Sequence, residues 1–324
     1  MKTTVFILLI ISSLPLYSQK FLSFQKSKDA AVESVDFLKY ENITDISHNP
    51  GFTGALEKPC IRFNYSGQWL TMESHPYDIM ASYDQAIGKN NRFGVGVLFN
   101  RYQFNTKITY TLDLGFSVKF RLNDKNTLRC GISAISYNKN VQNTERSGRV
   151  YGDMISPFLG PWNPTFERKA VYNENYFNIK TGVWLTHEKY FAGLSILNIT
   201  QLYFGNQNQV ENSLSKNQQP LPLEIVMNGG YEFSLGSTVL VTPALQMEAR
   251  FHLPSDFSPS INFTFDEKVV LGVTYHNMNI AAINIGARLY EHLNIIFTAG
   301  TPLDEDLQRI SKFGLFETGI SYIF

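Results

Sequence analysis

The most constraining feature of this sequence is a strict alternation of apolar and polar residues over long stretches. It is clearest in residues 108–121, where every even position is apolar and every odd position is polar or glycine. A period of two puts successive side chains on opposite faces of a β-strand, so one face of this strand is apolar and the other polar. Residues 61–69 and 281–289 repeat the pattern. The chain is therefore predicted to consist of two-faced strands.

Extending this pattern along the chain predicts 14 strands, most of them ten or more residues long. Strands of soluble proteins cluster near five or six residues, whereas a tilted strand that crosses a bilayer needs about 9 to 11. Strand length therefore favours a membrane barrel over a sandwich. The predicted strands are 61–70, 76–86, 92–104, 108–121, 127–139, 175–186, 190–199, 221–233, 238–250, 257–265, 268–276, 279–290, 292–300 and 312–324.

Composition agrees with this prediction and excludes two other classes. The chain has 28 basic and 28 acidic residues among 324, and only 17% of its residues are charged, so nothing suggests nucleic acid as a partner. Beyond the first 20 residues there is no apolar run of 18 or more, which excludes a helical membrane protein. We predict an all-β fold, a transmembrane antiparallel up-and-down β-barrel.

The connections between the predicted strands test this prediction independently. In an outer-membrane barrel with an even number of strands, the termini and the short turns lie in the periplasm and the longer loops lie outside. The even-numbered connections are indeed short and polar, as in 88–91 and 123–126. The three longest, 140–174, 201–220 and 301–311, are the fifth, seventh and thirteenth. Parity thus supports an even strand count, long loops outside and periplasmic termini.

Both ends of the chain carry export signals. Lys2 followed by an apolar stretch from Val5 to Leu16 resembles a signal peptide, with cleavage expected between Ser18 and Gln19. We therefore expect a leader at 1–18, a periplasmic segment or plug at 19–60, and a barrel at 61–324. The last strand ends on an aromatic residue, the pattern that the outer-membrane assembly machinery recognises. The residues of this expected assembly signal are Phe316, Ile320, Tyr322 and Phe324.

Nothing in the sequence indicates an enzyme. The six histidines form no H-E-x-x-H or E-x-x-H pair, and there is no G-x-S-x-G elbow. The two cysteines, Cys60 and Cys130, are too few for a zinc site made of cysteines. We expect no catalytic residues, no cofactor and no metal. Gly94 and Gly96 lie within a predicted strand, where they indicate close packing or curvature rather than a nucleotide-binding loop.

Charged residues within the strands form the first candidate site. Both signs occur, so the side chains could hydrogen-bond across the lumen, bind a plug or line a solute pathway, and we favour a structural or plug-binding network. The set of twelve is Arg62, Arg101, Asp113, Lys119, Arg121, Arg129, Lys180, Glu232, Glu248, Arg250, Arg288 and Glu317. The main lumen candidates are Arg62, Asp113, Lys119, Arg121, Arg288 and Glu317.

The fifth connection is the second candidate site. It is too long for a simple turn and is rich in proline and aromatic residues, which form contact surfaces at low entropic cost. It could contact a partner outside the cell, or fold into the mouth of its own barrel. The candidate contact residues are Tyr151, Phe158, Trp162, Phe166 and Tyr172.

Two short motifs carry a family resemblance. Asn49-Pro50-Gly51 with Gly54 precedes the first predicted strand, and Gln68-Trp69 ends it. Their order resembles the PorP/SprF family of Bacteroidota outer-membrane proteins, which carries an N-P-A-x-x-G motif followed by Q-W. Strand number and terminal aromatic also match, so the resemblance covers essentially the whole mature chain. Gly51 stands where alanine is usual, and a Gln-rich opening is missing from 21–48.

The resemblance implies an outer-membrane component of the type IX secretion system. Such proteins are associated with export and surface attachment of large cargo, notably gliding adhesins with a type B C-terminal sorting domain. Others associate with the core machinery through a periplasmic lipoprotein that binds peptidoglycan. The implied partners are therefore secreted cargo, such a lipoprotein, other type IX components and outer-membrane lipid. The alternatives are a solute channel with a mobile plug, and a structural anchor joining the outer membrane to peptidoglycan.

Overall fold

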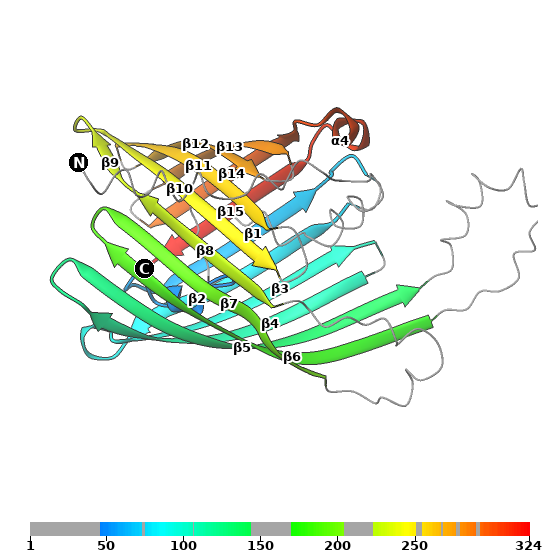
Figure 1. Cartoon of the computed structure of the whole chain (residues 1–324), viewed down its shortest axis with the longest axis horizontal. Helices are drawn as coiled ribbons and strands as arrows, with labels where there is room; N and C mark the ends of the chain where they lie inside the picture. Colours follow the sequence, from blue (N-terminus) through cyan, green and yellow to red (C-terminus); the bar gives the residue numbers. More distant parts are fainter. Residues whose placement is uncertain are drawn as a thin grey trace, which may run out of the picture. The chain divides into compact units, whose positions relative to one another are not determined.

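The computed structural model describes residues 46–72, 75–105, 107–143, 170–203, 223–250, 255–266, 268–276, 279–289 and 292–324. Nearly all of them belong to antiparallel strands (Figure 1). The strands are β1 (Cys60–Gln68), β2 (Tyr77–Ile87), β3 (Phe93–Phe104), β4 (Lys107–Arg121), β5 (Asn126–Asn143), β6 (Ala170–His187), β7 (Tyr190–Tyr203), β8 (Glu224–Tyr231), β9 (Phe233–Leu235), β10 (Val239–Arg250), β11 (Asp256–Phe265), β12 (Val269–His276), β13 (Ile280–Leu289), β14 (Leu293–Pro302) and β15 (Leu315–Ile323).

The strands close into a barrel. Apart from β8 and β9, which do not pair with each other, every strand pairs with the next one in sequence, and β15 pairs with β1. The order of the strands therefore forms a ring. The strands β8 and β9 both pair with β10 and are two parts of one broken strand, which gives 14 strands in all. Closure satisfies the backbone hydrogen bonds that hydrocarbon cannot.

The predicted strands and the observed strands agree one for one. The main difference is length: β5 and β6 have 18 residues each, and their pairing continues to Asn143 opposite Ala170. These outer ends lack an apolar alternation, so hydrophobic pattern could not reveal them. The fifth connection is consequently shorter than predicted, 144–169 instead of 140–174.

The two faces of the barrel have opposite chemistry. Large apolar side chains on the outward phase are exposed, for example Leu114 (54%), Ile283 (59%) and Phe297 (50%). On the inward phase, polar and charged side chains such as Asp113 and Asn284 are each only 3% exposed. This is the reverse of a soluble protein and the arrangement that a lipid environment requires. The alternation of residues 108–121 is therefore confirmed as an apolar outer face and a polar inner face.

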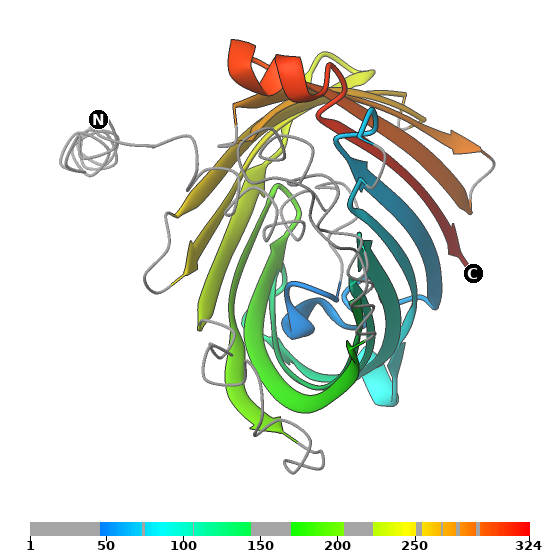
Figure 2. The ribbon, with the colours of Figure 1, turned by 90° about the vertical axis from the view of Figure 1, so that its right-hand side faces the viewer.

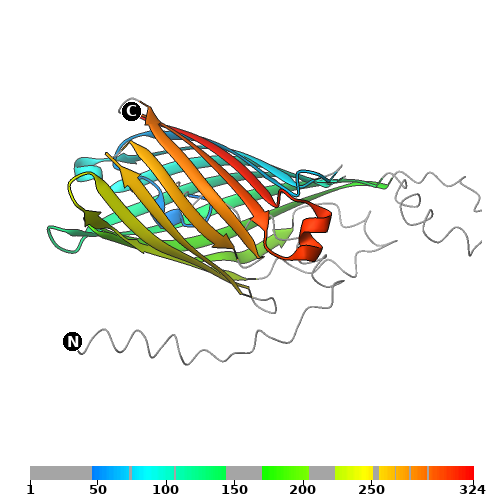
Figure 3. The same ribbon diagram turned by 90° about the horizontal axis from the view of Figure 1, so that it is seen from above.

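The two ends of the barrel also differ. The turns at Gly88–Arg92, 122–125, 188–189 and 236–238 are short, and all lie at the end where β1 begins and β15 finishes. The three longest connections, 144–169, 204–223 and 303–314, lie at the other end, together with the short turns 105–106 and 277–279, and the connection 303–314 carries the helix α4 (Glu305–Ile310). Figure 3 shows α4 and the C-terminal residue at opposite ends. We call these the long-connection end and the short-turn end.

Three short helices complete the described structure: the 3-10 helices η2 (Pro50–Phe52) and η3 (Lys89–Asn91), and α4. No helix in the described residues is long and apolar enough to cross a membrane. The helix η2 lies inside the ring of strands, as the view along the barrel shows (Figure 2).

Candidate functional site

The candidate site is the segment from Ile46 to Pro59, which we call the plug segment. It precedes β1 and packs against the inner faces of β2 to β7. Its fold follows from the local sequence: Pro50 occupies the first turn of η2, and the Asn49 side chain caps the helix by accepting a hydrogen bond from the Gly51 N–H at 2.8 Å. Gly54 then turns the chain with φ of 69°.

Glycines in the wall form the seat of the plug segment. A Cβ atom added to Gly94 would lie 2.1 Å from the carbonyl oxygen of Thr53. A Cβ atom added to Gly131 would lie 2.2 Å from the carbonyl oxygen of Pro50. At Gly182 it would lie 2.4 Å from Asn49 Oδ1. A real Cβ cannot approach this closely, so the seat exists only because these strands lack side chains there.

From the sequence alone, close packing is predicted as one of two alternatives at Gly94 and Gly96, and at no other glycine of the wall. The signal was present, because every strand from the third to the seventh has a glycine on its polar phase. These are Gly94, Gly96, Gly115, Gly131, Gly182 and Gly193.

Buried polar groups fix the end of the plug segment nearest β1. Asp84 is fully buried and accepts hydrogen bonds from the Gly54 N–H at 2.7 Å and from the Arg62 guanidinium. The Arg62 guanidinium also lies 5.6 Å from the centre of the Phe52 ring, within cation–π range. The Ser117 hydroxyl donates to the Thr53 carbonyl at 2.6 Å. Gly54 of the motif, Arg62 of β1 and Asp84 of β2 therefore share one network.

A buried lysine fixes the other end. The Lys180 ammonium lies 2.5 Å from Asp113 Oδ2 and donates to the carbonyl oxygens of Ile46 at 2.7 Å and Ser47 at 2.5 Å. Its three protons thus have three acceptors in a site closed to water. Ser195 donates to the His48 carbonyl at 2.6 Å. This end of the plug segment is thus held through its backbone carbonyl groups.

Apolar contacts fill the space between these anchors. The Phe52 ring meets Trp184 edge to face, with centroids 5.1 Å apart. Ile46, Met80 and Leu98 complete a buried cluster. This cluster gives the plug segment a small hydrophobic core of its own.

An exposed ion pair closes the site at the short-turn end. Glu57 lies 2.5 Å from the Lys119 ammonium and accepts a hydrogen bond from the Asn91 side chain at 3.3 Å. Burial alone would raise the pKa of Glu57, but these hydrogen bonds and the positive charges of Lys119 and Arg129 outweigh it and hold that pKa below its ordinary value. The Glu57 side chain is 44% exposed, so the pair adds little stability.

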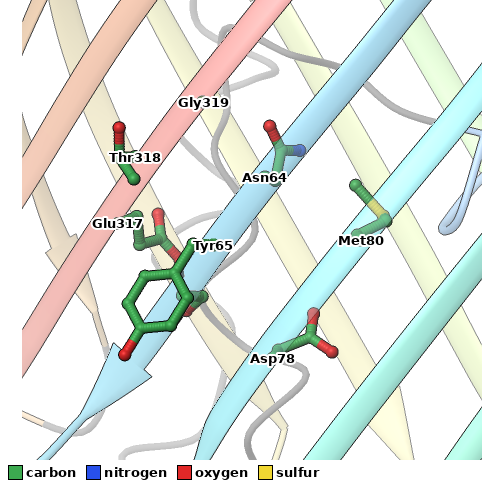
Figure 4. Close-up of a pocket in the computed structure, with 8 residues that line it drawn as sticks. Asn64, Tyr65, Asp78, Met80, Glu317, Thr318 and Gly319 are labelled. Carbon is green, nitrogen blue, oxygen red and sulfur yellow. Dashed lines mark hydrogen bonds between the residues drawn. The ribbon is translucent and has the colours of Figure 1, made fainter.

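The other lumen candidates lie apart from the plug segment. Arg121 is at the rim, paired with Asp124 at 2.8 Å, and both are exposed. Arg288 is also exposed and donates to Asn294 at 3.1 Å. Glu317 accepts a hydrogen bond from Ser66 at 3.1 Å and is buried. It lines a small pocket where β15, β1 and β2 meet, together with Asn64, Tyr65, Ser66, Asp78, Met80, Thr318 and Gly319 (Figure 4).

The comparison with known families is decisive. A family model described as type IX secretion system membrane protein PorP/SprF matches residues 30–322. The chain belongs to the PorP/SprF family. It is therefore an outer-membrane component of the type IX secretion system, as the sequence motifs had indicated.

Known proteins outside this family offer little more. No curated protein matches the chain. Among solved structures, the toluene transporter TbuX of Ralstonia pickettii is 10% identical, with 86% of this chain and 91% of that chain covered and a TM-score of 0.45. The toluene transporter TodX of P. putida is 8% identical, with coverages of 85% and 92% and a TM-score of 0.46. The KdgM porin is 10% identical, with coverages of 82% and 99% and a TM-score of 0.38.

The structure separates the two motifs on which the family resemblance rested. Asn49 to Gly54 lie in the seat near the short-turn end, whereas Gln68 and Trp69 lie at the far end of β1, where the Trp69 N–H donates to the Gly314 carbonyl. Gly51 stands where the family usually has alanine, and there is little space for a side chain at this position. An added Cβ would lie 2.9 Å from the backbone nitrogen of Trp184. The first motif contacts the wall, and the second shapes the opposite rim.

The remaining predicted residues lie elsewhere. Ile320, Tyr322 and Phe324 are exposed on the outer face of the last strand, at 43%, 41% and 55%. Tyr172 lies in β6, opposite Val141, and not in a loop as predicted. The other candidates of the fifth connection, Tyr151, Phe158, Trp162 and Phe166, lie outside the described residues.

Among the residues that the structure describes, no group of three or more His, Cys, Asp or Glu side chains could hold a metal ion. Both cysteines are free, with Cys60 buried. The arrangement that the structure does show is the plug segment held by hydrogen bonds against the inner wall of the barrel.

Proposed function

We propose that this barrel serves type IX secretion as a plugged, non-catalytic platform at which a large secreted surface protein docks, is exported or is anchored. The observation that carries the proposal is the plug segment itself, which is tied to the inner wall by hydrogen bonds to Asp84, Ser117, Lys180 and Ser195. A docking platform has to keep the membrane closed while it holds a partner. Such a fixed plug would meet this requirement.

The wall opposite the plug segment supports a closed lumen as well. Asn262, Asn284 and Thr298 face inward on β11, β13 and β14 and are each only 3% exposed. A wide aqueous channel would leave such side chains open to water. This argues against the alternative of an open solute channel.

We further propose that the chain is exported with a leader at 1–18, and that the short-turn end faces the periplasm. An even-stranded barrel places its termini and short turns there. The plug segment and Glu57 would then face a periplasmic lipoprotein, and the long connections would face cargo. The third possibility, an anchor to peptidoglycan, uses only the first of these surfaces.

Affinity purification of the full-length protein in mild detergent separates these functions. We expect a large surface protein with a C-terminal sorting domain to co-purify, together with other type IX components. A solute channel would bring down no reproducible partner. A structural anchor would bring down only periplasmic or wall-binding proteins, and either outcome would contradict the docking function.

A loop variant tests the proposed contact surface. Replacing Tyr151, Phe158, Trp162 and Phe166 with serine should release the cargo if the fifth connection contacts it, because aromatic anchors dominate protein interfaces. Serine at Leu303 and Phe313, which are exposed on a different long connection, is the matched control. Unchanged cargo retention in the first variant would refute this contact surface and leave the barrel assignment intact.

A further inference from the structure

One charged side chain within the strands lies on the outer, apolar face of the barrel and not on the inner, polar face. Arg101 was counted with the lumen charges, but the structure places it on the outward phase of β3 with Val97 and Phe99, which are 37% and 46% exposed. The other Asp, Glu, Lys and Arg residues within the strands whose side chains the structure describes all lie on the inward phase. These are Arg62, Asp78, Asp84, Lys107, Asp113, Lys119, Arg121, Arg129, Lys139, Lys180, Glu224, Glu248, Arg250, Asp256, Arg288 and Glu317.

Neutral partners hold the Arg101 guanidinium in place. It donates to the Tyr77 hydroxyl at 2.7 Å and to the Gln103 side chain, and Tyr77 itself donates to Gln103 at 2.7 Å. The guanidinium carbon lies 5.3 Å from the centre of the Tyr77 ring. None of the ion pairs in the described part of the chain includes Arg101. Its hydrogen-bond partners among the described residues are thus neutral, and they orient the charge.

Its height in the barrel matches a membrane interface. Arg101 follows Phe93, the first residue of β3, by eight positions. At about 3.3 Å per residue and a tilt of about 40°, this is roughly 20 Å along the barrel axis, while the apolar band of such barrels is about 25 Å tall. A long arginine side chain can therefore reach the head groups at the long-connection end.

Aromatic rings surround the position on the lipid side. Tyr65 stacks on Tyr77 with centroids 6.3 Å apart and lies 6.5 Å from Phe316. Phe99 lies 6.2 Å from Tyr110, which pairs with Arg101 across β3 and β4. Tyrosine at this level packs against lipid while its hydroxyl stays wet. The surface therefore offers apolar contact directly beside a cation whose partners in the described part of the chain are neutral.

We propose that Arg101, oriented by Tyr77 and Gln103, binds the phosphate of a membrane lipid in the leaflet at the long-connection end. A guanidinium recognises phosphate through two parallel hydrogen bonds, and the neighbouring rings contact the rest of the lipid. A lipid is the ligand, and not a soluble anion, because the site opens onto the apolar outer face. Such a lipid would fix the barrel's orientation and height on this side.

Native mass spectrometry of the full-length protein in detergent tests the site, with phosphatidic acid as the probe and phosphatidylcholine as the reference lipid. Wild type should bind phosphatidic acid at least tenfold more tightly. Arg101→Gln should remove about tenfold of this affinity, and Arg101→Lys should restore part of it. Arg121→Gln, which removes an exposed cation on the inward phase at the other end, should change it less than twofold.

Three outcomes would overturn the proposal. Wild-type affinity in Arg101→Gln would show that the guanidinium is not the contact. An equal loss in Arg121→Gln would indicate attraction by overall charge. Displacement of the lipid by millimolar inorganic phosphate would identify a site for soluble anions. The heat-dependent gel mobility of each variant, which reports a folded barrel, has to equal that of wild type for the comparison to count.

Discussion

At the scale of single residues, Lys180 shows how a charge can be held inside this barrel. In place of water, its ammonium group contacts the Asp113 carboxylate and donates hydrogen bonds to two backbone carbonyls of the plug segment. Removing one partner of a buried ion pair leaves the other charged and unsolvated, which is far more costly than losing an exposed pair. The stability of the plug segment in its seat therefore depends on the buried contacts of Lys180.

Lys180→Met should loosen the plug segment. The loss of a buried pair costs about 3–5 kcal/mol, which corresponds to about a hundredfold or more in the open fraction. A cysteine in place of the fully buried Thr53 reports opening through its rate of thiol labelling. Arg121→Gln is the control, with a cost below about 1 kcal/mol. Equal labelling rates in both variants would show that Lys180 does not hold the plug segment.

Gly131→Ala should displace the plug segment while the barrel stays folded. The new methyl group would lie 2.2 Å from the Pro50 carbonyl oxygen, so η2 has to move. Alanine at Gly229 is the matched control, because the nearest atom there is 3.3 Å from the added Cβ. We expect the Thr53→Cys thiol to be labelled about tenfold faster or more when Gly131→Ala is also present, and at an unchanged rate when Gly229→Ala is present. Similar rates in both would contradict the glycine seat.

The lowered pKa of Glu57 gives the plug segment a weak dependence on pH. A carboxylate whose pKa is lower in the folded state stabilises that state above its ordinary pKa of 4.5, and the effect is lost as pH falls through the lowered value. Hydrogen exchange of residues 50–57, corrected for intrinsic rates, should show protection falling by about 1 kcal/mol at most between pH 7 and pH 3. Glu57→Gln should lack this component, and an unchanged pH profile would refute it.

At the scale of elements, the connections determine how the barrel is oriented. The connections at one end are all short, whereas the three longest connections, one of which carries α4, lie at the other end. Even-stranded outer-membrane barrels have short periplasmic turns and longer extracellular loops. We therefore expect Asp124→Cys, at a short turn, to lie in the periplasm, and Phe313→Cys, near α4, to lie outside the cell. Their side chains are accessible, since Asp124 is 95% and Phe313 58% exposed.

An impermeant thiol reagent applied to whole cells tests this orientation. Phe313→Cys should react, and Asp124→Cys should react only after the outer membrane is permeabilised. The native Cys60 and Cys130 are replaced by serine in both variants, so that each protein carries one thiol. The opposite labelling pattern would invert the proposed orientation and remove the argument that long connections face cargo.

At the scale of the whole molecule, strand pattern and turn parity were enough to predict the barrel. The plug segment could not be located in this way, because its seat is made by glycines on four different strands, β3 to β6, that only the closed sheet brings together. Arg101 was misassigned because it was grouped by charge, although its phase with Val97 and Phe99 was visible. The partner of Gly54, Asp84, lies 30 residues away and required the fold.

Planar-bilayer recording tests most directly whether the barrel is plugged. We predict that the purified wild-type protein shows no large steady conductance, and that Gly131→Ala produces discrete, long-lived channel openings while Gly229→Ala does not. A large, stable, ion-selective conductance in the wild-type protein would contradict the account and identify the barrel as a solute channel.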